Sequence, residues 1–158
     1  MRLSFTYDKK KVMQALRYHF ISQPEIRVLL IMIIIFDIIA AILYYLDKIR
    51  PEPFLLGSAI WFFFIISFWY LLPYNIYKRS ATFKESFIIT FKENYVMLQN
   101  PNGYVEWNWN QFTKFIESPN FFHLYFSSKS FFLVPKDNMN DDFKYELRVL
   151  LNNKIKKS

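Results

Sequence analysis

Two long apolar segments constrain the fold of this chain more than any other feature. The first, residues 28–46, carries a single charged side chain, Asp37, and the second, residues 54–74, carries none. A helix needs about 20 apolar residues to cross the hydrocarbon core of a bilayer, and both segments meet that length. The alternative, two buried core helices of a soluble protein, would leave too little chain to cover helices that are apolar on every face. We therefore predict a transmembrane helical hairpin.

Basic residues flank both apolar segments and indicate their orientation. Residues 1–27 contain six Lys or Arg, and further Lys and Arg follow the second segment at 78–84, whereas the link at 47–53 is balanced in charge. Lys and Arg near span ends favour the cytoplasm. We expect a multi-pass protein of the cell membrane with both termini cytoplasmic. The net charge of +7 is then largely explained by topology, so it does not indicate nucleic acid as a partner.

The pattern changes from long apolar runs to short β-type segments after residue 78. Short runs rich in aromatic and β-branched residues, separated by turn signals, predict strands at 86–91, 94–99, 104–109, 112–118, 121–127 and 131–135. A helix follows, with Asn140 as its N-cap. The predicted fold class is an α+β membrane protein, in which the hairpin joins a small antiparallel sheet or partial barrel closed by a C-terminal helix.

The N-terminal residues add a strand and a basic helix to this plan. Residues 3–7 alternate like a strand and are expected to join the cytoplasmic sheet, and Asp8 precedes a helix rich in Lys and Arg. The predicted organisation is an N-terminal strand and basic helix at 1–27, a transmembrane hairpin at 28–77 and a cytoplasmic domain at 78–158.

No constellation in the sequence points to catalysis, so we expect a protein that is not an enzyme. The chain lacks cysteine, and its two glycines cannot form a phosphate-binding loop. His19 and His123 lie far apart, so no metal or cofactor is expected. His123 should be a partly exposed strand residue. Trp107, Trp109, Phe112 and Phe115 are expected to be core residues, with Tyr104 on the opposite, exposed face.

Asp37 is the candidate for a functional contact inside the membrane. An acid at the middle of a span costs roughly 2.5–3.5 kcal/mol to insert, so such residues usually face protein. Ser67 is the obvious hydrogen-bond donor on the second span, and we expect it at a depth similar to that of Asp37. Asp37 could also pair across a homo-oligomer, helped by Ala40 and Ala41, or meet a basic group of another membrane protein. We favour a helix contact over a proton or ion path.

The Lys and Arg residues of the N-terminal helix are candidates for contact with lipid headgroups. These residues are Lys9, Lys10, Lys11 and Arg17. Each base near an anionic surface contributes roughly 1 kcal/mol of attraction. The alternative is a solvated helix face whose charges only set the topology.

Several stretches in this order resemble the YcxB-like family of small bacterial membrane proteins. They are "YKRSATFKESFIITF", "VEWNWNQFTKFIES" and "FFHLYFSSKSFFLVPKD", placed after the two apolar segments. The most specific parts are Trp109 followed by Phe112 and the strand ending at Pro135. The resemblance implies a membrane-anchored module whose C-terminal part is similar to bacterial pleckstrin-homology-like domains. It implies no catalytic residues.

Two functions are compatible with this plan. The first is a membrane-anchored interaction module, whose cytoplasmic domain is held at the inner face of the membrane to bind a protein or peptide. The alternative is an accessory or transport-coupled subunit of a membrane complex that acts through Asp37.

The charge bias generates a test of topology. Reporter proteins fused after Ser158 and within residues 47–53 should report opposite sides of the membrane, because Lys and Arg are concentrated at the outer ends of the hairpin. A C-terminal reporter that is active outside the cytoplasm would contradict the predicted orientation.

Overall fold

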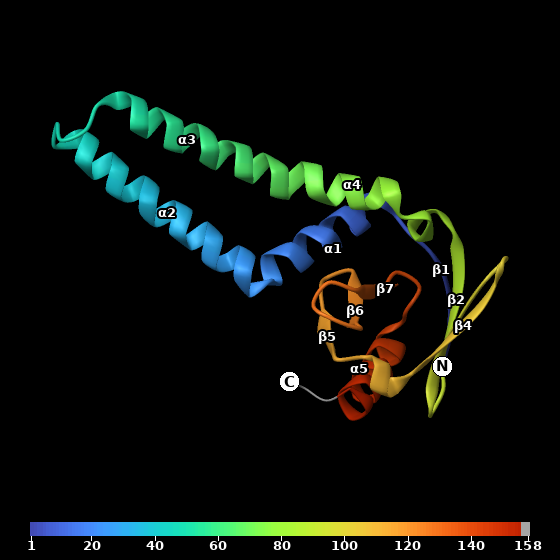
Figure 1. The fold of residues 1–158 in the computed structure, drawn as a ribbon. Helices are drawn as coiled ribbons and strands as arrows, with labels where there is room; N and C mark the ends of the chain where they lie inside the picture. The colour runs from blue at the N-terminus through green and yellow to red at the C-terminus, as the bar shows by residue number, and fades with distance from the viewer. Residues whose placement is uncertain (156–158) are drawn as a thin grey trace. The chain divides into compact units, whose positions relative to one another are not determined.

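The computed structural model describes residues 1–155, apart from the side chain of Pro53. The chain forms two compact units (Figure 1). Unit 1 combines Met1–Ala15 with the chain from Ser80 onward, and unit 2 is Leu16–Arg79. The N-terminal strand and the start of the first helix therefore fold with the C-terminal part of the chain, although unit 2 separates them in sequence.

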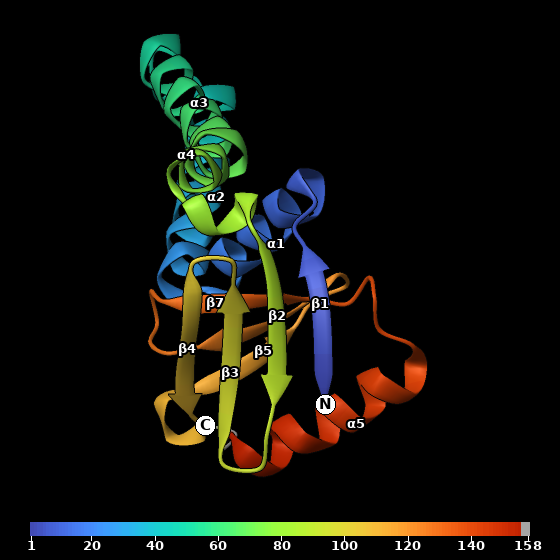
Figure 2. The ribbon, with the colours of Figure 1, turned by 90° about the vertical axis from the view of Figure 1, so that its right-hand side faces the viewer.

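Unit 1 contains two antiparallel sheets, which Figure 2 shows in front of one another. The first has the order β1-β2-β3-β4 and consists of β1 (Arg2–Thr6), β2 (Ser86–Phe91), β3 (Tyr95–Asn100) and β4 (Gly103–Asn108). The second has the order β5-β6-β7 and consists of β5 (Lys114–Glu117), β6 (Phe121–Tyr125) and β7 (Phe131–Pro135). The prediction of antiparallel strands is confirmed. The expected small sheet or partial barrel is built from two sheets, which do not form a closed barrel.

Strand β1 pairs with β2 along its whole length, so the N-terminal strand does join the sheet. Leu3 lies opposite Ile89, and Phe5 lies opposite Phe87. The N-terminal ammonium of Met1 also donates to the carbonyl of Phe91 at 3.0 Å. Alternate residues of β1 are buried, which is the period-2 pattern of a strand with one face on a core.

One core lies between the two sheets and is completed by helix α5 (Asp141–Lys154). Leu147 and Leu151 of α5 are fully buried, and the side chain of Asn140 accepts a hydrogen bond from the backbone N–H of Phe143 at 2.8 Å. This N-cap confirms the predicted start of the helix. The apolar stripe and the cap together explain why the segment forms a helix that covers the core.

An ionic cluster attaches α5 to β5. Arg148 donates through Nε and Nη2 to the two carboxylate oxygens of Glu117 at 2.7 and 2.8 Å, and Lys136 Nζ approaches Oε1 at 2.6 Å. These cations, led by Arg148, hold the pKa of Glu117 at about 2. Bidentate geometry fixes the orientation of the helix on the strand.

Trp109 and its neighbours form a tight turn rather than the end of a strand. The predicted strand 104–109 stops at Asn108, and Trp109–Gln111 form a 3-10 turn, η3, because Gln111 Oε1 accepts the backbone N–H of Asn108 at 3.0 Å. Trp109 is nevertheless 6 % exposed and donates through its indole N–H to the carbonyl of Lys92 at 3.1 Å. Its predicted place in the core is confirmed, as is that of Phe112.

Prolines mark the starts of two helices in the first half of the chain. Helix α1 (Lys9–Ser22) begins in unit 1 and ends in unit 2, and α2 (Pro24–Tyr45) and α3 (Pro51–Ile66) each begin at a proline, where no N–H needs a partner. A π-helical turn, η1 (Ser67–Leu71), joins α3 to α4 (Leu72–Arg79), and the 3-10 turn η2 (Ala81–Lys84) leads into β2.

Two helices are long and apolar enough to cross a membrane. They are Pro24–Tyr45, with mean hydropathy 2.9, and the continuous stretch Phe54–Arg79, with mean hydropathy 2.0. Only 6 % of the first apolar window and 0 % of the second are buried. This exposure argues against the alternative of two core helices covered by a soluble domain.

The two sides of the aromatic pattern in and after β4 can be compared by mutation. Trp109→Ala should lower the free energy of unfolding of unit 1 by about 3–5 kcal/mol, because it leaves a cavity in the core. Tyr104→Ala should cost less than about 0.5 kcal/mol, because Tyr104 is 71 % exposed. Equilibrium urea unfolding, monitored by amide hydrogen exchange in β2 and β3, measures the change in the free energy of unfolding for both variants.

The experiment requires the full chain. A fragment that starts at residue 78 would lack β1, and its absence would expose the edge of β2. Equal, small losses for the two variants would show that the assignment of buried and exposed faces is wrong.

Candidate functional site

The inner face of α2 carries a repeating seam of less exposed residues. Its members are Ile26, Leu30, Ile33, Asp37 and Ala40. Their spacing alternates between four and three residues, which places them along one side of a helix. The remaining residues of α2 are exposed. Asp37 therefore lies on the least exposed side of α2, and the other residues of this helix are largely exposed.

Gly57 of α3 lies beside Asp37 in this seam. A Cβ atom added at Gly57 would lie 3.5 Å from Asp37 Oδ1 and 3.2 Å from Cε1 of Phe36. The missing side chain thus lets the two helices approach at the level of the carboxylate. Near the link, the rings of Tyr44 and Phe54 stack with their centroids 5.6 Å apart. These contacts define which parts of α2 and α3 lie opposite each other.

The predicted contact between Asp37 and Ser67 is not formed. Ser67 lies nearly three helical turns beyond Gly57, or about 15 Å along the helix axis. The link between the helices is short, so Asp37 meets the early part of α3 rather than its end. Among the residues that the structure describes, Asp37 makes neither a hydrogen bond nor an ion pair.

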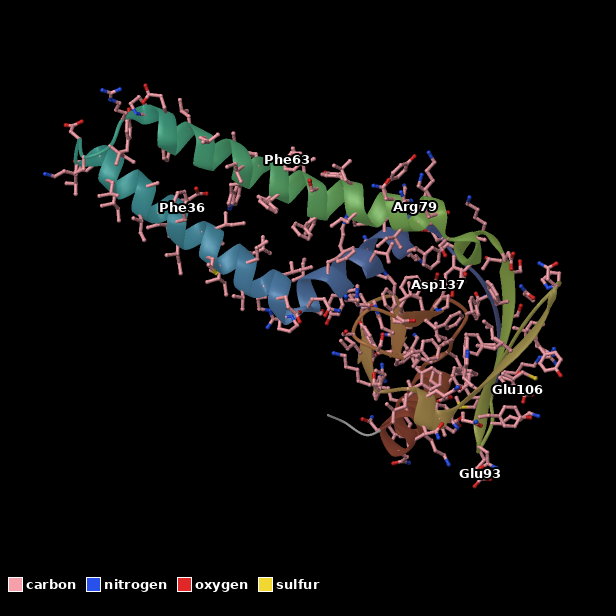
Figure 3. The ribbon with its side chains drawn as sticks, viewed as in Figure 1. Phe36, Phe63, Arg79, Glu93, Glu106 and Asp137 are labelled. Atoms are coloured by element: carbon pink, nitrogen blue, oxygen red, sulfur yellow. The ribbon has the colours of Figure 1, made fainter. Side chains whose placement is uncertain are left out.

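The predicted basic cluster is divided between the two units. Lys9, Lys10 and Lys11 belong to unit 1 and Arg17 to unit 2. Lys11 forms an ion pair with Asp137 at 2.6 Å (Asp137 is labelled in Figure 3), so its charge is already compensated. Arg17 instead donates through Nε to the backbone carbonyl of Trp69 at 2.8 Å. A role in lipid contact stays a prediction for all four residues.

Strand β4 is an edge of the first sheet, and the sequence did not reveal this. Within the described residues it pairs with β3 alone. Tyr104 and Val105 are 71 % and 42 % exposed, and Glu106 is also exposed on this strand (Figure 3). Alternate backbone N–H and C=O groups of such a strand point away from the sheet and are open to pairing.

Along one row of residues across the first sheet, the side chain on β4 is more exposed than those on the other strands. Leu3, Ile89, Leu98 and Val105 lie opposite one another on the core face, and their exposed fractions are 6 %, 0 %, 7 % and 42 %. Residues opposite each other in register share a face. Val105 therefore faces the core side, but the second sheet does not cover it. Beside it lies a cavity of about 250 Å³ lined partly by Phe87 and Leu98.

The prediction of a partly exposed His123 is wrong. The residue is fully buried, and its Nε2 lies 2.9 Å from the hydroxyl of Ser118. All five residues of β6 are buried, so both faces of this strand are covered. The alternation of the sequence indicated which residues share a face, but not that both faces would be enclosed.

The fold and these surfaces define an α+β protein with a helical hairpin and two small antiparallel sheets. The model of the YcxB-like protein family matches residues 91–147, which confirms the resemblance over that segment. The matched segment runs from the end of β2 into α5 and includes β4. No curated protein and no solved structure matches this chain.

The position of Asp37 generates a test of its contact role. Asp37→Asn should preserve association in membranes, because an amide has the same reach and both donates and accepts hydrogen bonds. Asp37→Leu should weaken association by about threefold to tenfold while leaving insertion intact. Energy transfer between two differently labelled copies, and between the chain and a co-purified partner, measures the effect.

Ser67→Ala is the matched control, because the structure separates Ser67 from Asp37. It should behave as the unmodified chain. If the Asp37→Asn and Asp37→Leu variants both associate as strongly as the unmodified chain, the contact role of Asp37 is ruled out. Loss of a transport activity in Asp37→Asn as complete as in Asp37→Leu would instead indicate a titrating acid.

Proposed function

We propose that this chain is a non-enzymatic, membrane-anchored interaction module that holds unit 1 at the inner face of the membrane to bind an extended protein segment. The observation that carries the proposal is the open edge of β4, a strand that is paired on one side only and that borders an uncovered part of the core.

The anchor consists of α2 and the continuous helix from α3 to α4. Both are long enough to span a bilayer and expose their apolar side chains almost entirely. Large exposed apolar surface on a protein marks contact with lipid or another protein. The buried Ala40 of α2, and Gly57 of α3 beside Asp37, support a hairpin in which the two spans pack against each other.

The pairing of β1 with β2 supports the same side for both ends of the hairpin. Strand β1 precedes the candidate spans and β2 follows them, yet the two strands are hydrogen-bonded neighbours. A chain that leaves one strand and returns to its neighbour must cross a membrane an even number of times. Together with the Lys and Arg bias, this supports cytoplasmic placement of unit 1.

The binding edge is suited to addition of a strand. An extended peptide that pairs with β4 would satisfy its outward backbone groups and extend the first sheet. Its alternate side chains would point toward the core side, where Val105 and the neighbouring cavity are open. At about 250 Å³ this cavity is below the size of most small-molecule sites, roughly 300–1,000 Å³, and is suited to a side chain.

The likeness to pleckstrin-homology-like domains is part of the proposal. It is supported by two antiparallel sheets that share one core with a C-terminal helix, and by the YcxB-like match over residues 91–147.

A second candidate function is an accessory or transport-coupled subunit of a membrane complex. The specific observation in its favour is Asp37, which lies in the hairpin seam and has no hydrogen-bond or ion-pair partner among the described residues. An acid in a span without an internal partner favours a contact supplied by a second copy or another membrane protein.

Selection of peptides from a random displayed library on the full-length protein tests the main proposal. Selected peptides should alternate apolar and polar residues, because only every second side chain faces the core side. Val105→Lys should weaken their binding at least tenfold, because it places a charge beside the apolar cavity. Titration with a fluorescent peptide measures the dissociation constant.

Tyr145→Lys provides the matched control, because Tyr145 of α5 is 66 % exposed and lies outside the β4 edge. Binding should be unchanged in this variant, and bound peptide should slow amide exchange in β4. Peptides that lose affinity equally in both variants, or that leave β4 exchange unaltered, would refute strand addition.

A further inference from the structure

Pro73 leaves a backbone carbonyl in the anchor without its usual partner. In an α-helix the carbonyl of Trp69 would accept the N–H of the residue four positions later, which is Pro73 and has no N–H. The π-helical turn η1 lies at this point, with the N–H of Leu72 bonded to the carbonyl of Ser67. Such turns interrupt the regular hydrogen-bond ladder and are frequent at functional sites.

The side chain of Arg17 contacts the backbone at this irregular point of the helix. Its Nε donates to the carbonyl of Trp69 at 2.8 Å, and its Cζ lies 5.2 Å and 5.5 Å from the ring centroids of Trp69 and Tyr70. The guanidinium is therefore held by one hydrogen bond and two aromatic faces. An arginine positioned in this way loses little further freedom when it binds a ligand.

The charge of Arg17 is not compensated within the described residues. No carboxylate there forms an ion pair with it, and its two terminal nitrogens make no hydrogen bond. Arg17 is half-buried, so its charge is partly removed from water. A planar guanidinium with free Nη groups fits the paired oxygens of a phosphate.

An apolar cleft of about 490 Å³ extends from Arg17 between the helices of unit 2. It is lined by Phe20 and Ile21 of α1, Leu30 and Ile34 of α2, and Trp61 and Ile65 of α3. Its volume lies within the range of ligand sites, roughly 300–1,000 Å³. Arg17 is the one charged residue in its lining.

We infer that this cleft binds one anionic phospholipid, with an acyl chain between the helices and the phosphate against Arg17. The occupant follows from the charge and polarity of the cleft. The apolar part of the cleft matches a lipid acyl chain, and the single cation at its margin, Arg17, matches an anionic headgroup. Trp69 and Tyr70 support a position of Arg17 at the level of the lipid headgroups, because Trp and Tyr are enriched at that level of a membrane. The inference rests on the proposed membrane anchorage of unit 2.

Quenching of tryptophan fluorescence by brominated lipid tests the site, because Trp61 and Trp69 line the cleft. The full-length protein is placed in phosphatidylcholine vesicles that contain a minor fraction of phosphatidylglycerol, with bromine on the chains of one lipid or the other at equal mole fraction. Brominated phosphatidylglycerol should quench the tryptophan fluorescence more strongly than brominated phosphatidylcholine does. The difference should correspond to an enrichment of phosphatidylglycerol at the protein of about fivefold to tenfold. Equal quenching by the two lipids would overturn the inference.

Three variants separate the specific site from general attraction to a charged surface. Arg17→Gln should abolish the preference, and Arg17→Lys should reduce it, because an ammonium lacks the planar fork. Arg27→Gln is the matched control, since it removes an exposed base of the same unit outside the cleft, and it should retain the preference. A preference that persists in Arg17→Gln, or that disappears equally in Arg27→Gln, would overturn the assignment to Arg17.

Two further measurements distinguish the sources of failure. Inorganic phosphate at millimolar concentration should not reduce the quenching, because a free anion does not fill the apolar cleft; competition by phosphate would overturn the lipid assignment. Flotation of each protein with the vesicles is measured first. A chain that does not float refutes the membrane anchor and the lipid site together, whereas a chain that floats without preference refutes the lipid site alone.

Discussion

The pairing of β1 with β2 is the interaction on which the rest of the structure depends. It joins residues that lie before and after the helical hairpin into one sheet, with Leu3 beside Ile89 and Phe5 beside Phe87. Without it, β2 would become an exposed edge and the core would lose Leu3 and Phe5. The same pairing requires both ends of the hairpin to return to one unit. A local feature of the sheet thus constrains the path of the helices.

The prolines and the π-helical turn shape the hairpin more than helix propensity does. Pro24 and Pro51 begin α2 and α3, where a missing N–H costs nothing. Pro73 lies within a helix next to the π-helical turn, and there Arg17 donates to the carbonyl of Trp69. One backbone irregularity therefore positions a cation beside an apolar cleft. This arrangement links a helix defect, an aromatic pair and a charge in a single local structure.

Several charged side chains of unit 1 form ion pairs, whereas polar groups at a few defined places lack such partners. Glu117 is held by Arg148 and Lys136, and Lys11 is paired with Asp137. Within the described residues Asp37 and the Nη groups of Arg17 have no such partner, and β4 has an unpaired edge. Buried or lipid-facing polar groups are costly when they are left unpaired. Their location at the seam, the cleft and the sheet edge is the reason that we place the proposed contacts there.

The sequence by itself determined the local elements, because their signals are local. Two apolar segments of membrane-spanning length, short β-type runs divided by turn residues, and the Asn140 cap before an apolar stripe were all readable from neighbouring residues. The burial of Trp109 and Phe112 and the exposure of Tyr104 were also predicted correctly. The order of the segments, with Trp109 followed by Phe112 and a strand ending at Pro135, gave the family resemblance, which the match over residues 91–147 confirms for that segment.

Only the tertiary structure decided which elements meet, because those contacts join residues distant in sequence. It separated the strands into two sheets, left β4 as an open edge and buried His123 from both sides. It placed Gly57 rather than Ser67 beside Asp37, since the short link sets which turns of the two helices face each other. It also brought Arg17 to the backbone carbonyl of Trp69. Periodicity assigns a residue to a face of its own element, whereas the partner of that face depends on the packing of the whole chain.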